Sequence, residues 1–361
     1  MKVGIVGLPA SGKSTVFNAL TRGDAQTGHF GSGRAEVNRG RTLVPDDRLD
    51  WLASLYETKK KTPAQVEFLD VPGLTPGSSD KGTAALIADL RTVDALLHVV
   101  RVFDDPSVPH PDGSVNARRD ADSLETELVL ADLAVVEKRL ERIAADLGKG
   151  LDKRRLTEEK ELLERIRSAL EDGQAVRDLD LDDSARQSLR GYAFLSLKPQ
   201  ILVGNVSEDE PAGGDSDAKL AEWAKERSLA YLAVSAKIES EIARMDDEEA
   251  AAFLEDLGLA ESSRARVIRA AFDALSLISF FTFGDDECKA WTLPKASDAV
   301  EAAGKIHSDI ARGFIRAEVV DFVTFRELGS WSAAKDAGRH RLEGKEYVMK
   351  DGDCVIFRFN V

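Results

Sequence analysis

The stretch Gly7-Leu-Pro-Ala-Ser-Gly-Lys13-Ser14-Thr15 decides the fold of this 361-residue chain. It follows an apolar run at residues 2–6 and fits the spacing G-x-x-x-x-G-K-[ST], in which a buried strand enters a glycine-framed loop and then a helix. The two glycines let the backbone curl so that its N–H groups point at phosphate oxygens, and the helix adds its positive N-terminal end. The sequence therefore predicts a loop that binds the phosphates of a nucleoside triphosphate.

The residues of this loop have separate expected roles. Lys13 is expected to reach the β- and γ-phosphates and to stabilise the charge that develops there, and the Ser14 hydroxyl to bind Mg²⁺. Contacts with the nucleotide are expected along the whole loop, from Pro9, Ala10, Ser11, Gly12, Lys13, Ser14 and Thr15.

A second phosphate-side motif, Asp70-Val-Pro-Gly73, follows the apolar run at residues 66–69. Asp70 is expected to hold the Mg²⁺ shell, and the Gly73 amide to sense the γ-phosphate. In Ras-like proteins the residue after this glycine is a glutamine that orients the attacking water. Leu74 stands there in this chain and cannot hydrogen-bond water, so that route to hydrolysis is absent.

A base-recognition motif is expected at Asn205-Val206-Ser-Glu208, after the apolar run at residues 201–203, where a G protein carries N-K-x-D. The aspartate of that motif accepts hydrogen bonds from guanine, whereas the Glu208 side chain is one methylene longer and Val206 replaces the lysine. We therefore expect weak selectivity for guanine and a preference for adenine. Ser235-Ala236-Lys237 follows the next apolar run and is expected to complete the base pocket with backbone amides.

Bulk properties exclude several classes of protein. A formal net charge of -15 argues against a general electrostatic binder of DNA or of anionic membranes, and no apolar run approaches membrane-spanning length. Because a core strand is predicted at residues 3–6, we expect no signal peptide. Cys288 and Cys354 lie far apart without metal-ligand spacing, as is typical of reduced thiols in a cytoplasmic protein.

The apolar runs alternate with helical patterns and predict an α/β fold. Continuous apolar strands suit a parallel sheet that is covered on both faces, and we expect them at residues 3–6, 66–69, 96–100, 201–203 and 231–234. This nucleotide-binding domain is assigned to residues 1–121 and 196–277.

Residues 122–195 interrupt this rhythm with two helical stripes. The first has apolar residues at alternating spacings of four and three: Val129, Leu133, Val136, Leu140, Ile143 and Leu147. The second comprises Leu156, Leu163, Ile166 and Leu170. These stripes predict an inserted antiparallel helical hairpin, which serves either as a purely structural element or as a lever or docking arm.

Residues 278–361 have a third composition and are expected to form a small α+β module. Strands are predicted at residues 290–293, 347–349 and 355–359, separated by glycine-containing turns.

Taken together, these motifs resemble the YchF family of Obg-related P-loop ATPases, a translation-factor-like branch of the GTPase superfamily. The likeness covers nearly the whole chain and is specific at the phosphate loop, at the sequence NVSE and at residues 290–294, 302–318 and 350–361. It implies a TGS-type β-grasp fold for the last module. It also implies slow, Mg²⁺-dependent hydrolysis of ATP to ADP and phosphate, preference for ATP over GTP, association with ribosomes or ribosomal RNA, and a cytoplasmic location. Neither sequence-specific DNA nor a membrane is expected as a partner.

The resemblance also points to a histidine in a mobile loop beyond the third strand, where the family is thought to position water. His110 falls at the matching place, and an imidazole can accept a hydrogen bond from water. The alternative interpretation is a solvent-exposed loop histidine.

Two departures from the family pattern bear on hydrolysis. The family's first switch segment ends in a threonine that ligates Mg²⁺, but Arg34 takes that position here, and a guanidinium has no acceptor. Ser32 is the alternative ligand, and Arg34 contacting phosphate like an arginine finger is a second interpretation. Residues 74–83 are also slightly shorter than in the family. These changes indicate impaired hydrolysis, and they keep open an adaptor that holds nucleotide with little or no hydrolysis, as well as a GTPase.

Overall fold

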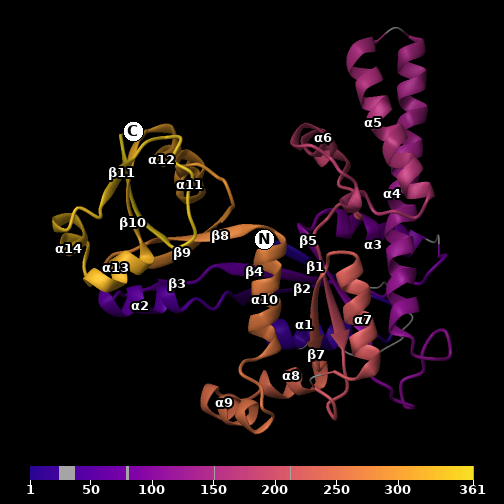
Figure 1. Ribbon diagram of the computed structural model, residues 1–361, viewed down its shortest axis with the longest axis horizontal. Coiled ribbons are helices and arrows are strands. Elements are labelled where there is room, and N and C mark those ends of the chain that lie inside the picture. Colours follow the sequence, from indigo (N-terminus) through magenta and orange to yellow (C-terminus); the bar gives the residue numbers. More distant parts are fainter. Residues whose placement is uncertain (24–36, 79–80, 150, 212, 361) are drawn as a thin grey trace. The chain divides into compact units, whose positions relative to one another are not determined.

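The protein is described here by a computed structural model that covers residues 1–23, 37–78, 81–149, 151–211 and 213–360 (Figure 1). The chain forms two compact units, one from residues 1–41 and 67–267 and the other from residues 42–66 and 268–361. Within the described residues, each unit is built on one six-stranded sheet. In that part of the chain no helix has the length and apolar character needed to cross a bilayer.

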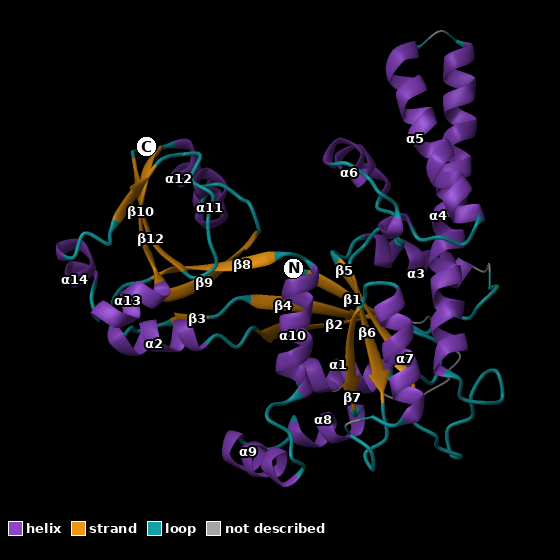
Figure 2. Cartoon of the chain, viewed as in Figure 1, coloured by secondary structure: helices purple, strands orange, loops and turns teal. Residues whose placement is uncertain are grey.

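The sheet of the first unit has the strand order β2-β4-β1-β5-β6-β7 (Figure 2). Strand β1 pairs in parallel with β4 and β5, and the parallel pairing continues through β6 to β7. The strands are β1 (Lys2–Val6), β2 (Asn38–Leu43), β4 (Gln65–Asp70), β5 (Ala95–Arg101), β6 (Gln200–Asn205) and β7 (Ala230–Val234). Because β5 and β6 are buried along their whole length, both faces of the sheet are covered, and the predicted parallel α/β sheet is confirmed.

Helices cover both faces of this sheet. Alternate residues of β5 point to opposite faces, and the neighbours Leu96 and Leu97 are both fully buried. Leu96 belongs to a cluster with Leu90 of α3 (Lys81–Arg91) and Leu124 of α4 (Ala117–Gly148). The other helices around this sheet are α1 (Lys13–Thr21), α7 (Asp215–Glu226), α8 (Ala236–Ile242) and α9 (Asp247–Asp256). Helix α10 (Ser263–Ala274) continues the chain from the first unit into the second.

The predicted helical hairpin is confirmed as α4 (Ala117–Gly148) and α5 (Lys153–Glu171). Both apolar stripes meet in one core cluster, in which Val136, Ile143, Leu163 and Ile166 are fully buried. Helix α4 starts before residue 122, because the Asn116 side chain caps it by accepting from the Arg119 amide. The chain returns to the sheet through η1 (Val176–Asp178), α6 (Asp183–Leu189) and η2 (Arg190–Tyr192).

A fully buried carboxylate fixes the hairpin to the sheet. Asp132 of α4 accepts from the Leu195 amide at 2.9 Å and from the Ser196 amide and hydroxyl at 2.7 and 2.8 Å. The guanidinium of Arg91 in α3 lies 3.2 Å from the same carboxylate. Four donors therefore compensate the burial of this charge and join α4 to α3 and to the segment before β6.

The second unit contains β3 (Lys61–Thr62), β8 (Leu277–Thr282), β9 (Cys288–Pro294), β10 (Phe314–Asp321), β11 (Arg341–Glu343) and β12 (Asp353–Phe359). The first long strand β8 lies parallel to the last strand β12, and each has an antiparallel neighbour on its other side. Helix α11 (Ala299–Ile306) buries its alanines against one face, and α12 (Ser308–Arg312) follows it. This is the strand arrangement of a β-grasp module, as expected from the sequence.

One predicted strand of this module is wrong. Residues 347–349 form no strand, because only Val348 makes an isolated bridge, to Asp298. The strands at residues 290–293 and 355–359 are confirmed as parts of β9 and β12.

Residues 42–66 pack within the second unit, although the sequence analysis included them in the nucleotide-binding domain. Leu49 and Leu52 of α2 (Asp47–Leu55) are buried with Phe281 and Phe325. Trp51 lies edge-on to Phe322, at a ring-centroid distance of 5.5 Å. The aromatic partners come from β8, α13 (Phe322–Leu328) and the loop after β8, and α14 (Trp331–Asp336) adds Trp331. An amphipathic nine-residue helix does not reveal in its sequence which core it joins.

We expect the Asp132→Ala variant to lose about 3 kcal/mol of unfolding free energy, because the backbone donors of residues 195 and 196 and the Arg91 charge would be left buried without an acceptor. Denaturant unfolding followed by circular dichroism measures this change. Glu137→Ala, at an exposed position of the same helix, is the matched control and should be nearly neutral. Equal stability of the two variants would contradict the assigned role of Asp132.

Candidate nucleotide-binding site

Two close contacts that only glycine permits join the phosphate loop to Asn205 and to the segment of Gly73. Gly12 has a φ of 89°, and a Cβ there would lie 2.1 Å from the Asn205 side-chain nitrogen. A Cβ on Gly73 would lie 2.7 Å from the backbone nitrogen of Pro9. The two predicted phosphate-side motifs and the end of β6 therefore meet at one place, at the carboxyl ends of β1, β4 and β6.

Lys13 is the first residue of α1, and its side chain is buried in the loop. The ammonium donates to the Leu8 carbonyl at 2.9 Å. Burial lowers the pKa of Lys13 to about 8, although the nearby carboxylate of Asp70 acts in the opposite direction. The loop thus holds one cationic donor whose partner is a backbone carbonyl, which a phosphate oxygen can replace.

Ser14 and Asp70 lie together as the predicted Mg²⁺ ligands require. The Ser14 hydroxyl hydrogen-bonds the Asp70 carboxylate, and burial raises the pKa of that carboxyl. One Asp70 oxygen is buried without a hydrogen-bond partner in the described residues. A hard cation satisfies such an oxygen, and carboxylate and hydroxyl oxygens are the ligands that Mg²⁺ takes. These residues therefore fit the ion.

Asn38 is a residue of this site that the sequence did not indicate. Its side-chain amide donates to the second Asp70 oxygen at 3.3 Å, from the first position of β2. Strand β2 is mostly polar and has no apolar run, so neither the strand nor its first residue could be recognised. Arg34 and Ser32, the predicted switch residues just before it, lie outside the described residues.

Asn205 connects the phosphate loop to the predicted base pocket. Its side-chain nitrogen donates to the Ser11 carbonyl at 3.0 Å, and its oxygen accepts from the Ala236 amide at 3.1 Å. The segments at residues 205–208 and 235–237 are thereby brought together, as expected. Ser235 is buried, and its hydroxyl has no hydrogen-bond partner within the described residues.

The acidic residue of the base pocket has a partner of its own. The Glu208 carboxylate lies 2.5 Å from the Lys237 ammonium, and both side chains are substantially exposed. Hydrogen bonding to Glu208 raises the pKa of Lys237. Val206, at the place of the G-protein lysine, is buried.

Leu74 belongs to the hydrophobic core. It is 3% exposed and packs with Val6, Leu69 and Val71, while its amide donates to the Gly7 carbonyl at 3.2 Å. The side chain therefore points into the protein interior, where a water-orienting residue would be of no use.

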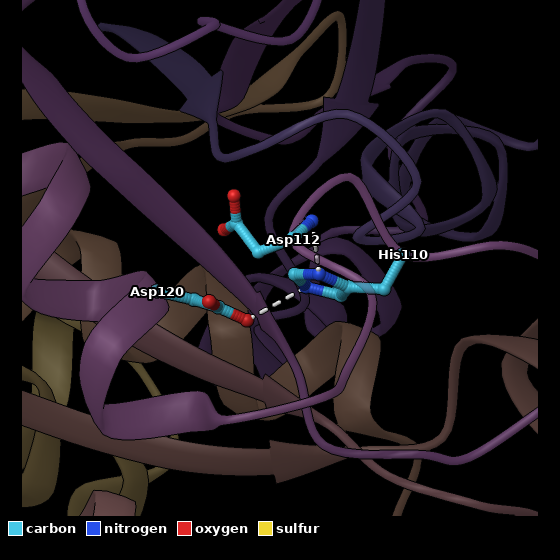
Figure 3. Close-up of side chains that lie close together, drawn as sticks. All are labelled: His110, Asp112 and Asp120. Atoms are coloured by element: carbon cyan, nitrogen blue, oxygen red, sulfur yellow. Dashed lines mark hydrogen bonds and ion pairs between the residues drawn. The ribbon is translucent and has the colours of Figure 1, made fainter.

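His110 lies in the loop between β5 and α4, and its ring is buried (Figure 3). Its Nε2 atom lies 2.9 Å from an Asp120 carboxylate oxygen, and its Nδ1 atom accepts from the Asp112 amide at 3.1 Å. The interpretation as a solvent-exposed histidine is therefore wrong. A small pocket is lined by His110 and Asp120 together with Leu8, Pro9 and Ser11 of the phosphate loop.

Arg101 holds the loop that carries His110. This arginine ends β5 and is 2% exposed, and its guanidinium donates to the carbonyls of Phe103, Asp105 and Val108 at 2.9–3.2 Å. The guanidinium also lies over the Phe103 ring, 4.5 Å from its centroid. The only sequence signal for this residue is weak: it is an arginine at the end of a strand that is apolar apart from His98.

The carboxylates of Asp112 and Asp120 and the His110 ring form a compact cluster, with one ligand atom of each within 4.8 Å of the others. Arg119 already donates two hydrogen bonds to Asp120, at 2.9 and 2.8 Å, and lies 3.7 Å from Asp112. A guanidinium beside the carboxylates repels a metal ion, so we interpret the cluster as a hydrogen-bonded one.

Comparisons with known proteins agree with this geometry. The family model YchF-GTPase_C, described as a protein of unknown function, matches residues 277–360. A second model, described as a 50S ribosome-binding GTPase, matches residues 2–138. The chain is 42% identical to the Ribosome-binding ATPase YchF of Bacillus subtilis over 367 residues, which cover 100% of both proteins. The chain belongs to the YchF family.

Other YchF relatives extend this match. The Ribosome-binding ATPase YchF of Pasteurella multocida is 41% identical, with 100% of this chain and 99% of the relative covered. The Obg-like ATPase 1 of Oryza sativa subsp. japonica is 38% identical, with 100% and 92% covered. The structure of the Schizosaccharomyces pombe YchF GTPase superimposes with a TM-score of 0.87 at 30% identity, covering 99% and 97%. The family and the P-loop nucleotide-binding fold expected from the sequence are thus confirmed.

Because the pKa of Lys13 lies at about 8, we expect the affinity for ATP to fall as the pH rises from about 7 to about 9. Phosphates favour the charged ammonium and raise its pKa in the complex, so above pH 8 binding must take up a proton. The expected loss is about tenfold in Kd, measured by calorimetry in buffers of different ionisation enthalpy.

The matched control for this pH dependence is Lys13→Arg, because a guanidinium stays charged over this range. Any binding that remains in this variant should not depend on pH. A constant ATP affinity of the unaltered protein from pH 7 to 9 would show that Lys13 does not control binding in this way.

Proposed function

We propose that this chain is a slow, Mg²⁺-dependent ATPase that prefers ATP to GTP and whose bound nucleotide regulates its association with the ribosome. The observation that carries the ATP preference is the pairing of Glu208 with Lys237 beside the buried Val206. Guanine recognition needs a free carboxylate at this place, and here the carboxylate is longer and already paired. The names of the relatives, which call them ribosome-binding ATPases, support the ribosome as partner and the cytoplasm as location.

The residues around the phosphates have complementary roles in this proposal. Ser14 and Asp70 would hold Mg²⁺, which neutralises charge on the phosphate oxygens. Lys13 exchanges its bond to the Leu8 carbonyl for a phosphate oxygen, and the Gly73 amide contacts the γ-phosphate. Loop amides from residues 9–15 bind the remaining oxygens, so that water attacks in line on a fully compensated phosphate.

His110 is the residue we assign to the attacking water. Its ring lies in the same pocket as Leu8, Pro9 and Ser11, and Leu74 is buried in the core and leaves no competing candidate at its own position. Both ring nitrogens are engaged in hydrogen bonds, so one of these must open before the ring can accept from water. This requirement supports a slow reaction.

A nucleotide-holding adaptor is the second candidate. It is favoured by the hydrogen bonds that occupy both ring nitrogens of His110 and by Arg34 in the first switch segment. Single-turnover hydrolysis distinguishes the two. In an ATPase, His110→Ala lowers the rate by a factor of about 10². In an adaptor, the rate is negligible and His110→Ala leaves it unchanged.

Base selectivity tests the central observation. The double variant Val206→Lys, Glu208→Asp restores the G-protein pattern and should shift the ratio of GTP to ATP affinity toward GTP by at least about tenfold. Competition of ATP and GTP against a fluorescent nucleotide measures this ratio. Glu210→Gln, at a nearby exposed position, is the control and should leave the ratio unchanged. A clear GTP preference of the unaltered protein would make it a GTPase instead.

Association with the ribosome is tested by co-sedimentation with purified ribosomes in the presence of ATP, ADP or a non-hydrolysable ATP analogue. We expect binding to differ at least severalfold between the nucleotide states. Lys13→Ala, which loses nucleotide, should remove that difference. Absence of the protein from the ribosomal pellet in every state would overturn this part of the proposal.

A further inference from the structure

We propose that Asp120 is a positioning residue for His110: its carboxylate fixes the imidazole in the tautomer that carries its proton on Nε2, which leaves Nδ1 as the nitrogen that accepts from the attacking water. This inference rests on the proposed function, in which His110 orients that water. It adds a residue on another element, the first turn of α4, whose contribution the sequence did not indicate.

Two independent contacts define the tautomer. The Asp112 backbone amide can only donate, so the Nδ1 atom that it contacts at 3.1 Å must accept. The Asp120 carboxylate can only accept, so the Nε2 atom 2.9 Å away must donate. Both contacts require the same distribution of protons on the ring (Figure 3).

The two hydrogen bonds of the His110 ring differ in how easily they break. Asp120 is 3% exposed, and its other oxygen accepts two hydrogen bonds from Arg119, so it is held on a long helix by a charge-assisted network. The Asp112 amide belongs to the same loop as His110 and is a neutral donor in an exposed residue. A small movement of the loop therefore frees Nδ1 for water while Nε2 stays bound to Asp120.

The ring that carries this nitrogen lies in a pocket shared with the phosphate loop. Arg101 binds three carbonyls of the loop and limits how far the ring can move. The pocket that contains His110 and Asp120 also contains Ser11, whose buried hydroxyl has no hydrogen-bond partner among the described residues. A carboxylate that orients a histidine toward a reacting group on its other side is a recurring arrangement in enzymes.

The first experiment compares Asp120→Asn with the matched control Asp104→Asn in steady-state ATP hydrolysis. Asp104 is an exposed aspartate in the same loop, outside the cluster of His110, Asp112 and Asp120. We expect Asp120→Asn to lower kcat at least about tenfold with KM unchanged, because an amide both donates and accepts and no longer selects one tautomer. Asp104→Asn should retain the full rate. Equal rates of the two variants would overturn the inference.

A double-mutant cycle separates positioning from general damage to the fold. If Asp120 acts only through His110, the variant His110→Gln, Asp120→Asn should be no slower than His110→Gln alone. Additive losses would overturn the inference, because they would mean that Asp120 acts by another route. The pair Asp120→Glu and Asp120→Gln repeats the comparison at equal side-chain length, and partial recovery of the rate is expected only with the glutamate.

Nitrogen-15 NMR of the imidazole rings tests the tautomer without reference to activity. The His110 signals are assigned by their loss in His110→Gln. We expect a protonated Nε2 and an unprotonated Nδ1 in the unaltered protein, and a mixture in Asp120→Asn. An unchanged tautomer in Asp120→Asn overturns the inference even if the rate falls. A full rate in His110→Gln, by contrast, overturns the proposed role of His110 in hydrolysis, and the tautomer measurement still decides what Asp120 does.

Discussion

The side-chain amide of Asn205 is the interaction on which the nucleotide site depends. It ends β6, donates to the phosphate loop and accepts from the first residue of α8, so three segments distant in sequence share one buried group. The close approach of Gly12 to the same nitrogen exists because of this bond. A buried amide with both ends satisfied fixes distances within a few tenths of an ångström, which a site for a triphosphate and a base needs.

A second theme is the way buried cations are neutralised. Lys13 donates to the Leu8 carbonyl and Arg101 to three loop carbonyls, and the partly buried Lys198 donates to carbonyls at the end of α3 and just after it. A carbonyl compensates only part of a full charge, so such a cation retains attraction for an anion. The Lys13 ammonium is directed toward the predicted phosphate position, whereas the Arg101 guanidinium stabilises the loop that carries His110.

Much of the fold could be predicted because its strands and helices have strong local patterns. The continuous apolar runs located five strands, the four-three spacing located the hairpin, and the glycine-framed loop located the phosphate site. Strand β2 and helix α2 could not be predicted, because their burial is decided by partners far along the chain, such as Phe281 and Phe325 for α2. The engagement of His110 was missed for a different reason. Its partners Asp112 and Asp120 are close in sequence, but the irregular segment between β5 and α4 has no periodic pattern that shows where the ring points.

Three carboxylates of α4 bind it to the rest of the first unit. Asp120 binds the His110 ring, Asp122 accepts from the Trp223 indole, and Asp132 accepts from residues 195 and 196. At 100° per residue, Asp122 and Asp132 lie about 200° and about 120° around the helix axis from Asp120. Contacts on three sides therefore prevent α4 from rotating about its axis. Beyond Asp132 it projects for about 24 Å, backed by α5. The hairpin is therefore anchored at one end only. A sideways force on its outer end produces a bending moment at the anchored end, where the first turn of α4 binds His110 through Asp120.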